Sequence, residues 1–247
     1  MRIFPTSGGG GGRLALCLGA VMSGLALCSF APSSQRGVET PFDPNALLSD
    51  AAFRDTNAIG VGELETFLRH TPYGRKSRLA LFDADGQSAA EVVIAKARAA
   101  RINPLVLVAK LQVEQSLVSR QDASPRALDF ALGCECPDGR ACGTKSRGFA
   151  AQVECAAQKL AAYFDELTDR GATRSLWRVG APRKAACGDV VVPRDRATAS
   201  LYTYTPFVLP GKGGNWLFDR VFRRFGHYLG YYPETVRASA VSSPVAR

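Results

Sequence analysis

The sequence predicts a single, mainly α-helical domain with few or no strands. Apolar residues recur at helical spacing along most of the chain, several helix starts carry capping residues, and only one short run is strand-like. The chain has 247 residues, of which 46% are hydrophobic and 21% are charged, so it can bury one sizeable core. This composition excludes a fibrous chain and one that is disordered throughout.

The first expected elements are a short helix and a turn. Leu64, Phe67 and Leu68 give residues 61–70 an apolar helical face. Asp83-Ala-Asp-Gly86 then marks a turn. It lacks the remaining ligand positions of a calcium loop, so we interpret it as a plain turn.

Capping residues locate the next helices. Ser88-Ala-Ala-Glu91 is a capping box that opens a helix to about residue 101. Asn103 and Pro104 are the cap and first residue of a helix expected over 104–119. A long helix over 149–170 should end at Gly171. Its apolar stripe comprises Phe149, Val153, Ala156, Leu160, Tyr163 and Leu167.

The C-terminal part predicts two more helices, over 197–204 and 216–229. The last has one apolar face, formed by Phe218, Val221, Phe222, Phe225 and Leu229. Val190-Val-Val192 is the strand-like run.

The N-terminal residues predict export. Arg2 and Arg13 precede an apolar run that suits a secretory signal peptide over residues 1–31. A lipid anchor at Cys28 is the alternative, because Leu25-Ala-Leu-Cys28 resembles a lipoprotein box. We therefore expect a periplasmic or extracellular protein with a linker over 32–45, one folded domain over 46–235 and a flexible tail over 236–247.

Cysteine usage agrees with export. Five cysteines follow the predicted signal: Cys134, Cys136, Cys142, Cys155 and Cys187. A zinc site usually takes its ligands from two closely spaced pairs of Cys or His residues. These cysteines do not form two such pairs and the chain has only two His, so no metal site is expected. In an oxidising compartment they predict two disulfides and a fifth cysteine that stays free or pairs between chains, with the pairing left open.

Glu114 is the candidate catalytic residue. Leu107, Leu111 and Glu114 share a helical face, so the carboxyl group lies among apolar side chains, which should raise its pKa. A general acid that works near neutral pH needs such a shift. The alternative is a partly exposed Glu balanced by Lys110, one turn earlier.

Two motifs resemble a known superfamily. The segment Asn103-Pro-Leu-Val-Leu-Val-Ala-Lys-Leu-Gln-Val-Glu114-Gln-Ser116 resembles the catalytic helix of goose-type lysozymes and soluble lytic transglycosylases. Ala199-Ser-Leu-Tyr202-Thr-Tyr-Thr-Pro206 resembles their Ala-Tyr-Asn-x-x-Pro motif, with Tyr202 on the motif's Tyr. Across residues 47–230, the order and spacing of the short matching motifs are similar to those in exported bacterial lysozyme-like proteins. The resemblance implies a lysozyme-like fold with Glu114 as general acid.

Departures from the superfamily concern the rest of the site. Leu132-Gly133 leads into Cys134 where the transglycosylase signature continues to a Gln, for which Gln152 or Gln115 is a candidate substitute. Thr203 replaces the motif's Asn. The expected substrate-binding residues are Tyr202, Tyr204, Ser116 and Gln115. The candidates for a second carboxylate, each also readable as a loop or cap residue, are Asp129, Glu135 and Asp138.

The expected function is cleavage of peptidoglycan glycan strands by a lytic transglycosylase or muramidase. The alternatives are a non-catalytic cell-wall-binding or scaffold module and a glucosaminidase or chitinase-like hydrolase. The formal charge of +9 suits an anionic wall polymer or membrane surface, and export argues against nucleic acid. No cofactor is expected.

Overall fold

A computed structural model describes residues 41–84, 86–136 and 141–232. These residues belong to one compact unit that begins at Pro41. Helices dominate it, and its strands form three separate two-stranded antiparallel hairpins, so the prediction of a mainly α fold is confirmed. The predicted signal peptide, Cys28, most of the linker and the tail lie outside the described residues.

The elements follow one another along the chain with short connections. The helices are α1 (Asp50–Arg54), α2 (Val61–Arg69), the 3-10 helix η1 (Arg78–Leu81), α3 (Ala89–Ala99), α4 (Pro104–Gln115), α5 (Pro125–Asp129), α6 (Phe149–Arg170), α7 (Arg196–Tyr204) and α8 (Asn215–Leu229). The hairpins pair β1 (Asp83–Ala84) with β2 (Gln87–Ser88), β3 (Arg183–Lys184) with β4 (Val190–Val191), and β5 (Val208–Leu209) with β6 (Gly213–Gly214).

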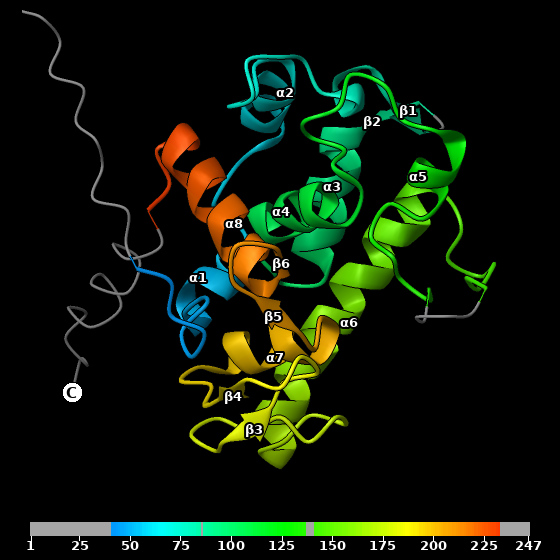
Figure 1. Ribbon diagram of the computed structural model, residues 1–247. Helices are drawn as coiled ribbons and strands as arrows, with labels where there is room; N and C mark the ends of the chain where they lie inside the picture. The colour runs from blue at the N-terminus through cyan, green and yellow to red at the C-terminus, as the bar shows by residue number, and fades with distance from the viewer. Residues whose placement is uncertain (1–40, 85, 137–140, 233–247) are drawn as a thin grey trace, which may run out of the picture. The chain divides into compact units, whose positions relative to one another are not determined.

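Helix α4 is the central helix, packed by α3, α6 and α8 (Figure 1). The Asn103 side chain caps its start by accepting the backbone N–H of Leu105 at 2.8 Å. Every residue from Pro104 to Leu111 is buried. A helix enclosed on all sides is apolar around its circumference, which explains the unbroken Leu-Val-Leu-Val run.

The C-terminal end of α4 differs from the prediction. The helix stops at Gln115 because Ser116 adopts a left-handed conformation with φ of 56°. The Gln112 side-chain oxygen then accepts the backbone N–H groups of Val118 and Ser119, at 3.1 and 2.9 Å. These bonds stabilise a turn where the spacing predicts one more helical turn, so the expected range of 104–119 is too long.

The capping predictions for α3 and α6 are confirmed. Ser88 and Glu91 form the reciprocal capping box at the start of α3. Gly171 ends α6 with φ of 68°. The apolar stripe on α6 is buried as expected, except that Phe164 replaces Tyr163 in the core.

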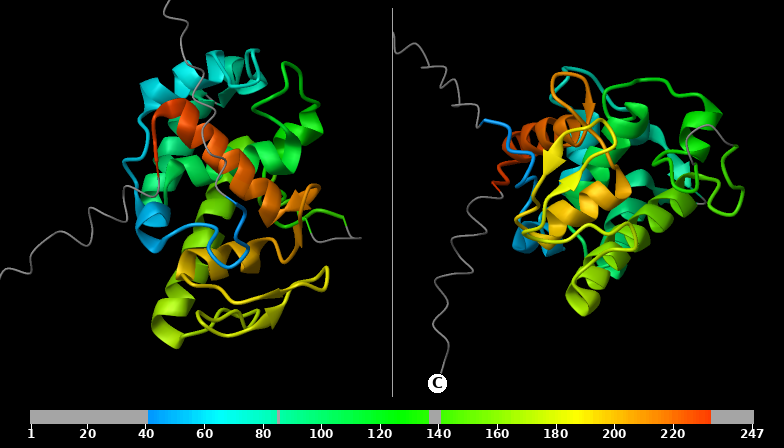
Figure 2. Two further views of the ribbon diagram at one scale, coloured as in Figure 1. Left: turned by 60° about the vertical axis from the view of Figure 1, so that its left-hand side comes forward. Right: turned by 60° about the horizontal axis from the view of Figure 1, so that its bottom comes forward.

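Among the C-terminal elements, α8 packs against α4. The predicted apolar face of α8 is buried through Phe218, Val221, Phe222 and Phe225. The strand-like run at 190–192 forms β4, which pairs with β3. The resulting hairpin lies beside α7 in both views of Figure 2.

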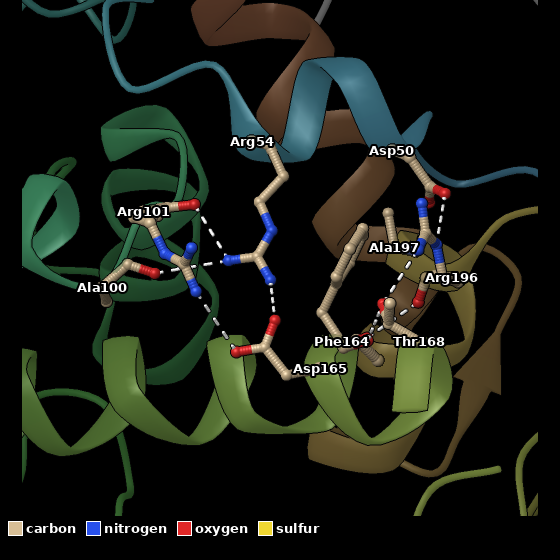
Figure 3. Close-up of polar contacts among 10 residues, drawn as sticks. Asp50, Arg54, Ala100, Arg101, Phe164, Asp165, Thr168, Arg196 and Ala197 are labelled. Atoms are coloured by element: carbon tan, nitrogen blue, oxygen red, sulfur yellow. Dashed lines mark hydrogen bonds and ion pairs between the residues drawn. The ribbon is translucent and has the colours of Figure 1, made fainter. Parts of the chain in front are cut away.

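A network of arginines joins α1 to α6 and α7 (Figure 3). Arg54 pairs with Asp165 and also donates to the carbonyl of Arg101. Its guanidinium carbon lies 4.2 Å from the Phe164 ring centroid, and that of Arg196 lies 4.6 Å from the same centroid. Phe164 therefore lies between two cations, an arrangement that orients the short helix α1.

The start of the unit corrects the predicted linker boundary. Asn45 accepts from the backbone N–H of Val192 at 2.7 Å through its side chain and from that of Arg194 at 2.8 Å through its carbonyl. Asp43 forms an ion pair with Arg194. Residues 43–45 therefore belong to the folded unit and not to a linker.

Candidate functional site

Glu114 lies where α4 leaves the core. The first eight positions of the helix are buried, whereas the Glu114 side chain, in the last turn, is 28% exposed. Burial of the preceding turns holds the backbone in place, and the carboxyl group reaches the surface. This is a suitable position for an acid that must meet a polymer from solvent.

Lys110 lies one turn before Glu114 and is completely enclosed. Its Nζ is 3.8 Å from Oε1 of Glu114 and donates a hydrogen bond of 2.6 Å to Oγ1 of Thr205. The ammonium group also lies over the rings of Tyr204 and Phe218, at 5.0 and 5.4 Å. Burial lowers the pKa of Lys110, and the Glu114 carboxylate opposes that change.

The segment at Leu132-Gly133 forms the wall beside the carboxyl group. Gly133 has φ of +63°, and a Cβ placed there would lie 3.7 Å from Oε2 of Glu114. The Tyr204 hydroxyl donates a hydrogen bond of 2.8 Å to the Leu132 carbonyl. Burial, together with the nearby Glu114 carboxylate, raises the pKa of Tyr204, so its hydroxyl keeps its proton at neutral pH.

The side chain of Gln152 holds this wall in place. The buried Gln152 amide accepts from the backbone N–H groups of Leu132 and Cys134 and donates to the carbonyls of Cys134 and Ser146. These four bonds use its full hydrogen-bonding capacity. Gln152 therefore positions the wall and does not replace the missing cleft Gln.

Both disulfides lie in or next to the same wall. One joins Cys134 to Cys155 on α6, and the other joins Cys136 to Cys142. Cys187 is free and exposed. The prediction of two disulfides is confirmed, and the structure supplies the pairing and identifies Cys187 as the fifth cysteine.

Tyr202 corrects the motif assignment. Its side chain is 0% exposed and stacks on Trp177 with a ring-centroid distance of 4.8 Å. A fully covered ring cannot stack on a sugar, so the prediction for Tyr202 is wrong. Thr203 also lies away from Glu114, since its hydroxyl bonds to Thr173 and to the Ala199 carbonyl. The residue beside Glu114 is Tyr204, two positions later.

The other predicted site residues lie in different surroundings. Gln115 and Ser116 are half-buried at the end of α4, next to Glu114 in the chain. Asp129 forms an ion pair of 2.7 Å with Arg147. Glu135 lies against Gly143, whose added Cβ would be 3.3 Å from its carboxylate oxygen. Asp138 lies outside the described residues.

The site carries no arrangement suited to a metal ion. Over the described ranges, no group of three or more His, Cys, Asp or Glu side chains is placed to hold one.

None of the helices in the described ranges has the length and the apolar character that a membrane span requires.

Comparison with known proteins gives one family. The model of the family described as LasA, N-terminal domain, matches residues 42–181, which is more than half of the chain. The chain belongs to the LasA N-terminal domain family. The match includes Lys110, Glu114 and Gly133 and ends before α7. No curated protein and no solved structure matches the chain. Membership in the LasA N-terminal domain family and the two disulfides are compatible with an exported protein.

Sequence reasoning on this LasA N-terminal domain missed two features of the site. The sequence suggests Lys110 only as a charge that balances a partly exposed Glu114 and does not predict that its side chain is fully buried and bonded to Thr205. The motif's spacing also points to Tyr202, whereas Tyr204 is the residue beside Glu114. The position of Lys110 inside an apolar run was the available signal for its burial.

Proposed function

We propose that this protein cleaves the glycan strands of peptidoglycan, as a lytic transglycosylase or muramidase, with Glu114 as the general acid. The observation that carries the proposal is the position of Glu114, half-exposed at the end of an enclosed helix and facing Gly133 beside Tyr204. The resemblance of the α4 segment to the catalytic helix of lysozyme-like proteins supports it. A periplasmic or extracellular location, with Cys28 as a candidate lipid anchor, is part of the same proposal.

The proposed reaction needs one carboxyl group. Glu114 gives its proton to the glycosidic oxygen while the bond from that oxygen to the anomeric carbon breaks. The C6 hydroxyl of the same sugar attacks the anomeric carbon, and its proton returns to Glu114. The product is a 1,6-anhydro sugar, and water does not enter. In a muramidase, water would attack instead, with a second carboxylate as base or nucleophile.

Glu114→Gln tests this proposal. The amide keeps the shape of the side chain but has no proton to give, so release of soluble fragments from purified peptidoglycan should fall by about 10²- to 10⁴-fold. Mass analysis of the fragments measures the loss, and circular dichroism checks the fold. Glu65→Gln is the matched control, because the Glu65 carboxylate pairs with Arg69 on α2 and accepts a hydrogen bond from the Ser88 hydroxyl, and the oxygen of an amide can still accept both. A loss below tenfold for Glu114→Gln refutes its assignment as the acid.

The Lys110–Glu114 contact favours a second candidate function. A nearby cation stabilises the charged carboxylate, whereas a general acid must carry a proton. The same fold without turnover would be a cell-wall-binding module. In that case the wild type and Glu114→Gln bind insoluble peptidoglycan equally, and neither releases fragments.

A further inference from the structure

An open cavity of about 540 Å³ lies next to the end of α4. Its walls come from the turn before η1, from the residues that follow α4, and from α8. The lining side chains that matter here are Tyr73, Arg75, Ser116, Arg120, Asp122 and Arg224. Ser116 is two residues beyond Glu114, so one wall of the cavity begins at the end of the helix that carries Glu114.

The cavity is strongly basic. Three arginines line it against one carboxylate, Asp122. Within the described ranges, Arg75, Arg120 and Arg224 have no acidic side chain at ion-pair distance, whereas Arg147, Arg174, Arg194 and Arg196 all do. Three like charges around one hollow repel one another, and an anion bound between them removes that repulsion.

Hydrogen bonds to backbone carbonyls hold the walls together. Ser77, which is buried, donates its hydroxyl to the Leu117 carbonyl at 2.9 Å, and the Arg78 N–H donates to the Arg120 carbonyl at 2.6 Å. From α8, Arg224 donates to the Pro72 carbonyl at 2.8 Å and its guanidinium lies 4.5 Å from the Tyr73 ring centroid. The three segments thus form a preorganised site and not a chance gap between loops.

The chemistry of the lining selects the ligand. A guanidinium group presents several N–H donors in a fixed plane that match a carboxylate. One Arg224 donor is used by Pro72, which leaves the others available. The volume lies within the range of about 300–1,000 Å³ found for small-molecule sites. A neutral glycan such as chitin has no charge to offer this cavity.

We infer that the cavity binds a carboxylate carried by the glycan strand, either from its stem peptide or from the lactyl group of muramic acid. The inference rests on the proposed function, because it takes the strand at Glu114 to be peptidoglycan. It adds a substrate class to that function. Strands that bear carboxylates bind in this cavity, whereas the cavity adds no affinity for neutral strands.

The test uses the full chain carrying Glu114→Gln, so that bound strands are not consumed. Three probes are titrated by calorimetry: disaccharide–peptide fragments of peptidoglycan, strands from which an amidase has removed the peptides, and chitin oligosaccharides. The added changes Arg75→Gln and Arg120→Gln remove two cavity charges. The matched control is Arg98→Gln with Arg178→Gln, two exposed arginines outside the cavity, which changes the net charge equally.

The cavity variant should bind carboxylate-bearing probes about tenfold or more weakly than the control, which corresponds to loss of one charge-assisted contact. Chitin binding should be the same in both. Weaker binding of the disaccharide–peptide probe alone identifies the stem peptide as the source, and weaker binding of the stripped strands identifies the lactyl group. Equal binding of every probe by the two variants overturns this inference alone. Binding of no probe by the Glu114→Gln chain overturns the proposed function and the inference with it.

Discussion

At the scale of single residues, two tyrosines of α7 have opposite environments. The Tyr204 hydroxyl donates to the Leu132 carbonyl, next to Glu114. The Tyr202 hydroxyl is buried and has no hydrogen-bond partner among the described residues. Burial raises the pKa of both hydroxyls, and Cys187 and Asp189 add to the rise at Tyr202. Only one of these hydroxyls is positioned to support the site.

Phenylalanine substitutions distinguish the two. Tyr204→Phe should lower the free energy of unfolding by about 1 kcal/mol, because it leaves the Leu132 carbonyl without its donor. Tyr202→Phe should leave it unchanged or raise it, since an unsatisfied buried hydroxyl is removed. Urea unfolding followed by circular dichroism measures both. A larger loss for Tyr202→Phe than for Tyr204→Phe would contradict this arrangement of α7.

The same pair shows what the sequence could specify in the site. Glu114 was identifiable because the end of an apolar helical run places it at a boundary between core and solvent. Tyr202 has the spacing of the motif's Tyr to Pro206, but the packing of α7 against Trp177 and Lys110 places Tyr204 beside Glu114. Two aromatic residues separated by one position face different sides of a helix, and local spacing cannot tell which side meets α4.

At the scale of elements, the long helices were predictable and the short ones were not. Helices α3, α4, α6 and α8 carry caps or a full apolar stripe in the local sequence. Helices α1 and α5 have only five residues each, too few for a periodic signal. Tertiary contacts, such as the Arg54 and Phe164 stacking that orients α1, stabilise such elements instead. The premature end of α4 has the same origin, because the Gln112 side chain replaces helical bonds with its own.

The disulfides should contribute unequally to stability. Replacing Cys134 and Cys155 by Ser should cost about 3 kcal/mol of unfolding free energy, because that bridge spans 21 residues. The pair Cys136 and Cys142, with a separation of 6, should cost about 2 kcal/mol. Cys187→Ser is the control and should change little, since its thiol is in no disulfide and a serine hydroxyl can also bond to the Val208 backbone groups that the thiol contacts. Denaturant titration of the three variants measures the order, and an effect of Cys187→Ser as large as the other two would contradict the pairing.

At the scale of the whole molecule, the site combines segments that are distant in sequence. Lys110, Glu114 and Leu132 lie within the segment that matches the LasA N-terminal domain family, whereas Tyr204 and Thr205 lie beyond it. The contacts from Lys110 to Thr205 and from Leu132 to Tyr204 join the two parts. The C-terminal elements are therefore needed to complete the environment of Glu114, although the family match ends before them.

The distribution of acids over the molecule predicts the reaction product. Asp129 forms an ion pair with Arg147, Glu135 lies against Gly143, and Asp138 lies outside the described residues. A reaction with one carboxyl group should leave 1,6-anhydromuramoyl ends on fragments released from peptidoglycan, because the sugar's own hydroxyl replaces water. Digestion in ¹⁸O-labelled water followed by mass spectrometry decides the question. An unlabelled anhydro product supports the single-acid route, whereas fragments with one labelled oxygen at the cleaved anomeric carbon would show hydrolysis and direct the search to Asp129, Glu135 or Asp138 as the second carboxylate.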